Sequence, residues 1–207
     1  MTAERTAAPA DRGARDVLRR LRVATAADHG RVERHLDLMA PGLDRDRLAS
    51  ALALLHGFWR AAEAGLDAWA VREPAAAAAL AWPHRRRAAL FAADLAALGA
   101  RPADAGPLLP TVAGTDAALG RMYVLEGATL GGVVIDRHLA GLPALAGVRL
   151  RAFSPYGSRT GAMWAAYRRA VRAHVAAGGD ADAVVTSARG TFAALARWCG
   201  ADEPVRA

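Results

Sequence analysis

Apolar residues recur every three or four positions along most of the 207-residue chain, which is the spacing of an amphipathic α-helix. No convincing stretch alternates with the period of two that a β-strand shows, and the chain contains no internal repeat. Alanine, the best helix former, dominates the 54% of residues that are hydrophobic. We therefore predict an all-α fold, a multi-helix bundle in a single domain.

Proline, glycine and capping residues divide this pattern into segments. Pro41 ends the first helix, and Asp44 is a suitable N-cap for the second. We expect a flexible N-terminal tail over residues 1–14, the helical domain over 15–200 and a C-terminal tail over 201–207. We expect two helices that begin near residues 15 and 45, followed by an alanine-rich helical region that continues to residue 98. Three further helices are expected over 115–139, 160–177 and 182–199.

The basic residues other than histidine are all arginines, 27 of them against 20 acidic residues, which gives a net charge of +7. A compositional bias toward arginine and alanine explains most of this excess. The arginines still make the surface attractive to anions, such as tetrapyrrole carboxylates or an acidic redox protein. No basic tail or RNA-binding aromatic motif accompanies them, so we expect no nucleic-acid partner.

The cysteine content and the hydropathy of the chain further limit the classes of protein to which it can belong. Cys199 is the single cysteine, so neither a disulfide framework nor a cysteine-based metal site can form within one chain. The first residues lack the apolar core of a signal peptide, and the most apolar stretch, residues 75–82, is too short to cross a bilayer. We expect a cytoplasmic protein that does not bind membranes.

His29 stands out among the six histidines because it lies on the apolar stripe of the first helix. Glu33 follows one helical turn later, within reach of one ring nitrogen. Such a carboxylate fixes the tautomer of a metal-binding imidazole and raises its basicity. His35 falls on the other side of this helix and is expected to face solvent. The HxxxE pattern predicts that His29 is a metal ligand.

Glycines interrupt the apolar helix expected over residues 115–139. Gly127, Gly131 and Gly132 occupy its middle, where each glycine costs about 1 kcal/mol relative to alanine. Gly127 and Gly131 are four residues apart and share one face. Two explanations stay open at this point: close approach of a flat ligand to bare backbone, or close packing of another helix. In both cases we expect a helix bent at its glycines.

Three blocks, in order along the chain, resemble the heme oxygenase family. They are LRVATAADHGRVE (residues 21–33), GRMYVLEGATLGG (120–132) and FSPYGSRTGAMWAAYRRAV (153–171). The resemblance extends over residues 17–198 and is closest to the bacterial form associated with bacteriophytochromes. It implies a helical heme oxygenase-like bundle with a kinked distal helix that carries the glycines.

The resemblance assigns roles to the residues singled out above. His29 matches the proximal iron ligand, and Glu33 matches its hydrogen-bond partner. Gly127 and Gly131 match the catalytic distal-helix glycines that lie over the heme. Ala128 departs from the pattern, because many members carry an aspartate there that organises water near bound oxygen.

The resemblance also implies basic partners for the two heme propionates. Arg22 matches one such position, and Tyr123 is a second candidate beside it. Arg168, Arg169 and Arg172 are candidates for the other propionate, and the sequence does not choose among them.

The implied activity is oxidative cleavage of heme to biliverdin, carbon monoxide and ferrous iron. Heme b would be both substrate and cofactor, and O2 would be the oxidant. The chain has no dinucleotide-binding glycine motif, flavin motif or iron–sulfur cysteine set, so electrons must come from a ferredoxin or a flavoprotein reductase. A bacteriophytochrome is a candidate recipient of the biliverdin. The main alternative, which Ala128 keeps open, is a non-catalytic heme or tetrapyrrole binder on the same fold.

Other helical classes fit the sequence less well. A thiaminase-type fold needs an active-site cysteine, whereas Cys199 lies near the C-terminus in an amphipathic stretch. A di-iron bundle needs Glu-x-x-His pairs, which the sequence lacks. The remaining alternative is a protein that serves only as an interaction module.

Overall fold

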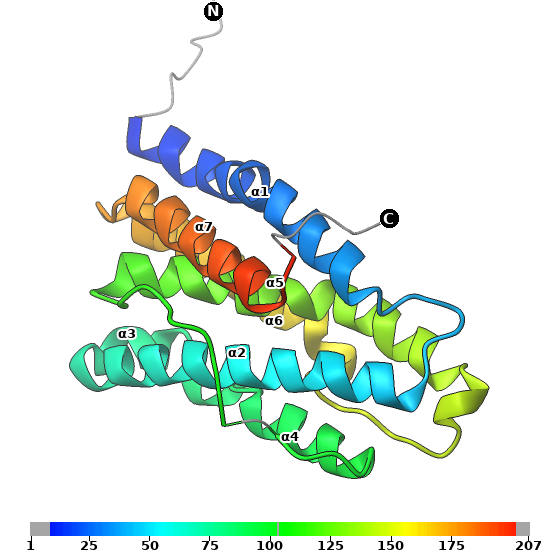
Figure 1. Ribbon diagram of the computed structural model, residues 1–207. Helices are drawn as coiled ribbons and strands as arrows, with labels where there is room; N and C mark the ends of the chain where they lie inside the picture. Colours follow the sequence, from blue (N-terminus) through cyan, green and yellow to red (C-terminus); the bar gives the residue numbers. More distant parts are fainter. Residues whose placement is uncertain (1–8, 103, 202–207) are drawn as a thin grey trace, which may run out of the picture.

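The computed structural model describes residues 9–102 and 104–201, and over this part the chain is helical with no β-strand (Figure 1). The predicted all-α fold is therefore confirmed. Three short 3₁₀ turns, Trp82–Arg85, Pro143–Leu145 and Gly157–Arg159, connect longer elements. The α-helices are α1 (Pro9–Leu36), α2 (Arg45–Arg72), α3 (Pro74–Ala79), α4 (Ala88–Ala97), α5 (Thr115–Ala140), α6 (Thr160–Ala176) and α7 (Ala181–Trp198).

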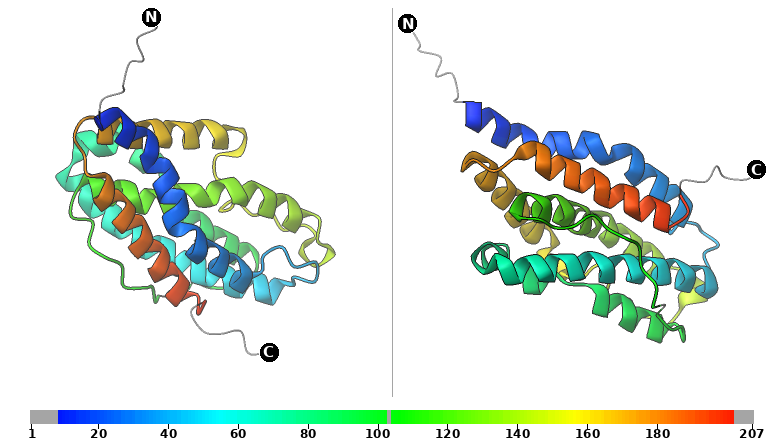
Figure 2. Two further views of the ribbon diagram at one scale, coloured as in Figure 1. Left: turned by 90° about the horizontal axis from the view of Figure 1, so that it is seen from above. Right: turned by 60° about the vertical axis from the view of Figure 1, so that its left-hand side comes forward.

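Helix α5 runs through the middle of the bundle. It packs against α6 and α7 on one side and against α2 on the other, and α2 in turn carries α3 and α4. Helix α1 packs against α6 and α7 and forms the outer layer above α5 (Figures 1 and 2). Two outer layers, α1 above and α2 with α4 below, thus enclose α5 with α6 and α7.

The central place of α5 explains its apolar sequence. It is the one helix of the described residues that is long and apolar enough to span a membrane, but 56% of that apolar window is buried inside the protein. A buried core helix has the same composition as a membrane span. The expected cytoplasmic location stays a prediction.

The structure corrects two boundaries drawn from the sequence. Helix α1 begins at Pro9, so residues 9–14 are helical and do not belong to a tail, while the expected tail residues 1–8 and 202–207 lie outside the described residues. The alanine-rich third region is also broken into α3, a 3₁₀ turn and α4. Ala81 adopts a left-handed backbone conformation (φ 50°) that ends the first piece before Pro83.

A buried carboxylate determines where α4 begins. Glu63 on α2 accepts hydrogen bonds from the backbone N–H groups of Arg87 (2.5 Å) and Ala88 (2.9 Å). This side chain thereby caps the free N–H groups of the first turn of α4. No local sequence pattern reveals such a cap, because Glu63 precedes Arg87 by 24 residues.

Candidate functional site

His29 lies in the C-terminal half of α1 with 51% of its side chain exposed. Its Nδ1 atom is 3.2 Å from Oε2 of Glu33, which is the contact predicted from the HxxxE spacing. The edge-to-face contact of its ring with Phe192 of α7, at 5.7 Å between centroids, holds the imidazole from the side. Because Glu33 engages Nδ1, Nε2 is the nitrogen available to a metal.

One interaction relates α1 to α5. Tyr123 on α5 lies within reach of the Thr25 side chain on α1, and the Thr25 hydroxyl donates to the Leu21 carbonyl oxygen at 2.9 Å. Thr25 precedes His29 by four residues, and Tyr123 precedes Gly127 by four residues. Both helices run from left to right in Figure 1, and they cross one another in the view from above in Figure 2. His29 and Gly127 each lie one helical turn beyond this point along their own helix.

The face of α5 that follows this contact is open and apolar. A Cβ atom built on Gly127 or Gly131 would meet no other atom within 4 Å. Leu130 (43% exposed) and Val134 (56% exposed) continue the same face, although both are large hydrophobic residues. This surface of bare backbone and exposed aliphatic side chains matches the flat apolar face of a porphyrin.

Close packing explains a different pair of glycines on the same helix. A Cβ atom on Gly120 would collide with the Val184 carbonyl oxygen of α7, and one on Gly132 would collide with the Phe153 carbonyl oxygen. Of the two explanations left open by the sequence, packing therefore applies to Gly132 and does not apply to Gly127 or Gly131. Helix α5 remains helical through all of these positions, and the bend that we expected stays a prediction.

An aromatic and basic cluster lies at the Tyr123 end of the open face. The ring centroids of Trp164 on α6 and Tyr123 are 5.9 Å apart, and the Arg168 guanidinium carbon lies 6.0 Å from the Trp164 ring centroid. The Arg168 Nε atom is buried and has no hydrogen-bond partner. Burial raises the pKa of Tyr123, while the nearby Thr25 side chain and the Arg22 charge oppose that shift.

These contacts distinguish the three arginines of α6. Arg168 is the one whose contacts bring it to the Tyr123 cluster, opposite Arg22 of α1. Arg169 and Arg172 are exposed. Arg168 lies against Trp164, which contacts Tyr123, and the Arg22 charge acts on Tyr123, so these are the groups available to the carboxylates of a ligand on the open face.

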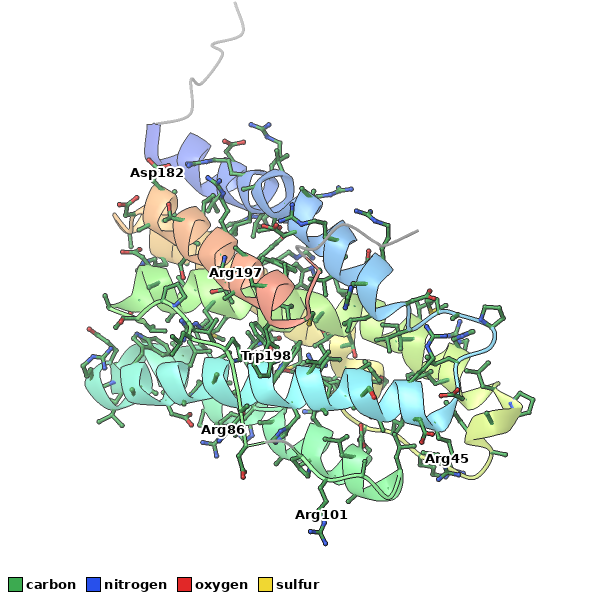
Figure 3. All side chains as sticks on the ribbon, viewed as in Figure 1. Arg45, Arg86, Arg101, Asp182, Arg197 and Trp198 are labelled. Carbon is green, nitrogen blue, oxygen red and sulfur yellow. The ribbon has the colours of Figure 1, made fainter. Side chains whose placement is uncertain are left out.

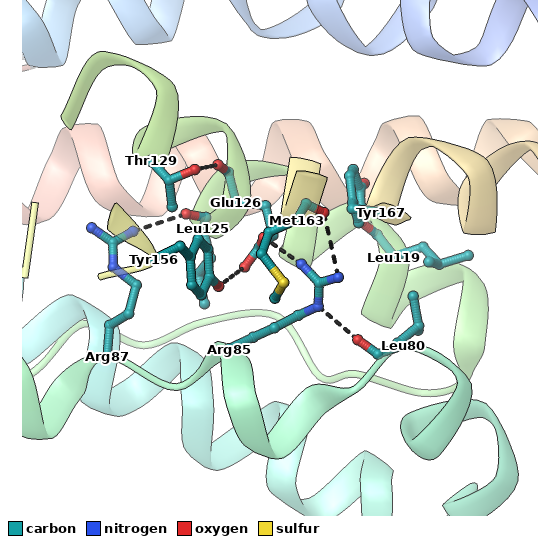
Figure 4. A network of polar contacts seen from close by, with 10 residues as sticks. All are labelled: Leu80, Arg85, Arg87, Leu119, Leu125, Glu126, Thr129, Tyr156, Met163 and Tyr167. Atoms are coloured by element: carbon teal, nitrogen blue, oxygen red, sulfur yellow. Dashed lines mark hydrogen bonds and ion pairs between the residues drawn. The ribbon is translucent and has the colours of Figure 1, made fainter. Parts of the chain in front are cut away.

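A buried polar network lies behind the open face and was missed from the sequence (Figure 4). Glu126, next to Gly127, forms an ion pair with Arg85 and accepts a hydrogen bond of 2.7 Å from the Tyr156 hydroxyl. Burial raises the pKa of Glu126, although both partners oppose the shift. The one sequence signal for this network was Glu126 itself, a charged residue within the apolar block VLEGAT. A charge that is buried needs a partner.

Arg87 holds the backbone of α5 at the same place. Its side chain, which is buried, donates hydrogen bonds to the carbonyl oxygens of Leu125 (3.1 Å) and Ala152 (3.0 Å) and stacks near the Trp59 ring. Burial lowers the pKa of Arg87 to about 10. The turn of α5 just before Gly127 is therefore fixed from behind by Arg85 and Arg87, while its front stays open.

Fold and site together define a class: an all-helical protein with an exposed imidazole–carboxylate pair on α1, an open apolar face on α5, and arginines near Tyr123. The chain is similar to the heme oxygenase from Neisseria meningitidis, whose crystal structures hold NO and CO. The two share 23% identity over 92% of this chain and 94% of the other, with a TM-score of 0.67. The chain thus has the heme oxygenase fold. No family model and no curated protein sequence matches it.

Proposed function

We propose that this protein is a heme oxygenase, which cleaves heme b to biliverdin, carbon monoxide and ferrous iron with O2 and external electrons. The observation that carries the proposal is the open backbone of α5, because a Cβ atom at Gly127 or Gly131 would meet no other atom within 4 Å. The heme oxygenase fold supports it independently.

The residues present fit a heme group. His29 offers Nε2 to the iron, and Glu33 keeps the other ring nitrogen engaged. The space beside Gly127 and Gly131, which a side chain would otherwise fill, is open to the porphyrin. The unpartnered Nε of Arg168 is suited to a propionate, as heme carries two carboxylates.

Each residue has a defined task in this proposal. Heme, when bound, would supply the iron that activates O2 and the carbon skeleton that is oxidised. Glu33 orients the His29 ring, and Arg22, Tyr123 and Arg168 would fix the rotation of the porphyrin by holding its propionates. The bare backbone at Gly127 and Gly131 leaves little room above the porphyrin, which excludes foreign substrates.

Proton delivery must differ from that of members with a distal aspartate. Ala128 has no titratable group, and the buried Thr129 hydroxyl donates to the Glu126 carbonyl oxygen at 2.7 Å. We propose that protons arrive through water held on backbone carbonyl groups of the open face.

The partners follow from the chemistry. An external ferredoxin or flavoprotein reductase would supply the electrons, and an arginine-rich surface suits an acidic donor. A bacteriophytochrome is our candidate recipient of the bilin, and the cytoplasm is the expected location.

A non-catalytic heme or tetrapyrrole binder is the second candidate function. Ala128 favours it, because a protein that only holds heme needs no group to organise water above the iron. It would keep His29 and the propionate residues and would lack turnover.

A hemin titration followed by ultraviolet–visible absorption tests the proposal. We expect a Soret band typical of imidazole-bound heme, and after addition of ascorbate or reduced ferredoxin in air we expect its loss with the appearance of biliverdin. A stable Soret band under these conditions would favour the non-catalytic binder. Failure to bind hemin at all would reject both.

A pair of histidine variants tests the ligand. His29→Ala should lose the imidazole-bound spectrum and all turnover. His35→Ala is the matched control, because His35 is an exposed histidine six residues later on α1, and it should behave as the wild type. An unchanged spectrum in His29→Ala would reject the assignment.

A further inference from the structure

A hollow of about 280 Å³ lies between α2 and residues 107–112 of the segment that joins α4 to α5. Small residues of α2, Ala61, Gly65 and Ala68, form its floor, and two arginines, Arg72 and Arg121, complete its lining. The polar groups of Arg22, Tyr123 and Arg168 take no part in it.

The two arginines carry charge that no carboxylate in the described residues neutralises. Arg121 is only 2% exposed, and it donates to the carbonyl oxygens of Pro110 and Ala62, while its Nε has no hydrogen-bond partner. Arg72 donates to the carbonyl oxygens of Ala68 (2.9 Å) and Val112 (2.5 Å). Burial alone lowers the pKa of Arg121 to about 10, with no opposing acidic group.

A purely structural role explains only part of this arrangement. The bond from Arg121 to Pro110 anchors residues 107–112 over α2, and Gly65 leaves room for the guanidinium, because a Cβ there would collide with it. The unpartnered Nε of Arg121 and the absence of a carboxylate beside either arginine, within the described part of the chain, remain unexplained. Buried charges in proteins are paired with an opposite charge, and arginine suits planar or tetrahedral oxyanions.

We propose that this hollow is a binding site for a small oxyanion, a carboxylate or phosphate group held by Arg72 and Arg121. Its volume is close to the lower end of small-molecule sites, which begins at roughly 300 Å³. It therefore suits an anion of the size of inorganic phosphate or a short dicarboxylate.

The thermal unfolding midpoint of the full chain tests the site. Inorganic phosphate or succinate is titrated at constant ionic strength set with chloride, and a saturable rise in Tm is expected for at least one of them. A response to phosphate alone assigns a phosphoryl ligand, and a response to succinate assigns a carboxylate. A rise no larger than that with chloride, for both anions, would overturn the proposal.

Matched variants locate the binding. Arg72→Gln should weaken the anion response at least tenfold, while Arg45→Gln, which removes the same charge at the other end of α2 (Figure 3), should keep it. Equal responses in the two variants would overturn the assignment. Arg72→Gln should also bind hemin as the wild type does, so this test is independent of the proposed heme chemistry.

A gain-of-interaction variant gives a second readout. Ala68→Glu places a carboxylate on the exposed floor position beside both arginines. It should raise Tm in the absence of added anion and abolish the response to phosphate or succinate. An Ala68→Glu protein that still responds like the wild type would contradict the site.

Discussion

Two faces of α5 use the same residue type for opposite purposes. At Gly120 and Gly132 the missing side chain lets α7 and the Phe153 segment approach the helix backbone. At Gly127 and Gly131 the missing side chain leaves space that no part of the protein fills. Glycine in a helix is costly at all four positions, so each pair needs an explanation: close packing explains Gly120 and Gly132, and we propose a bound ligand for Gly127 and Gly131.

The polar groups follow the same division. On the packed side, Glu126 and Arg85 form a buried ion pair, and the buried Arg87 donates to backbone carbonyl oxygens. By contrast, His29 and Glu33 on α1 are both exposed. Rigidity is thus concentrated behind the proposed site. Changes on the packed face should lower stability, and changes on the open face should alter ligand binding.

The largest expected effect comes from Glu126→Leu. Arg85, which is 2% exposed, would lose its buried counter-ion, and breaking such a pair costs about 3–5 kcal/mol in the free energy of unfolding. Urea unfolding followed by circular dichroism measures the change. The exposed Glu33→Gln is the control and should stay within about 0.5 kcal/mol. Equal losses in the two variants would break the contrast between the faces.

Gly132→Ala should have the next largest effect. Its Cβ would collide with backbone atoms of Phe153, which cannot move aside as a side chain can, and such overpacking costs about 1–3 kcal/mol. The urea midpoint should fall, while the hemin spectrum of the folded protein stays unchanged. A variant as stable as the wild type would show that the packed face is not tight.

Gly127→Leu should give the opposite result. The new side chain enters open space and improves helix propensity, so stability should stay equal or rise by up to about 1 kcal/mol. Biliverdin formation should fall by about a hundredfold, because the side chain displaces the porphyrin from its working position. Normal biliverdin output from this variant would remove the distal role of the open face.

The smallest effect concerns pH. Burial raises the folded-state pKa of Glu126 above its ordinary value of 4.5, so the folded state holds this proton more tightly than the unfolded state. The contribution of Glu126 to stability is therefore fully present below pH 4.5 and is lost as the pH rises through the folded-state pKa. Urea unfolding at several pH values should show this loss in the wild type and a flatter profile in Glu126→Gln. Identical profiles would contradict it.

Local features were predictable from spacing alone. The boundaries of α6 and α7 agree with the sequence prediction to within a residue, because the apolar period is a local signal. The His29–Glu33 contact was predictable for the same reason, since residues four apart on a helix are neighbours. The start of α1 was placed wrongly and the break at Ala81 was missed, because helix ends depend on surroundings that a period does not show.

The sequence by itself determined the helical class, the imidazole–carboxylate pair and the glycine-rich helix, because each depends on residues within one or two turns. Only the tertiary structure decided which glycines are open, which arginine of α6 joins Tyr123, and that Glu126 meets Arg85. Those outcomes depend on which surfaces pack together across 30 or more residues of chain. Helical spacing carries no information about that choice, because it specifies the face on which a residue lies and not what will lie against it.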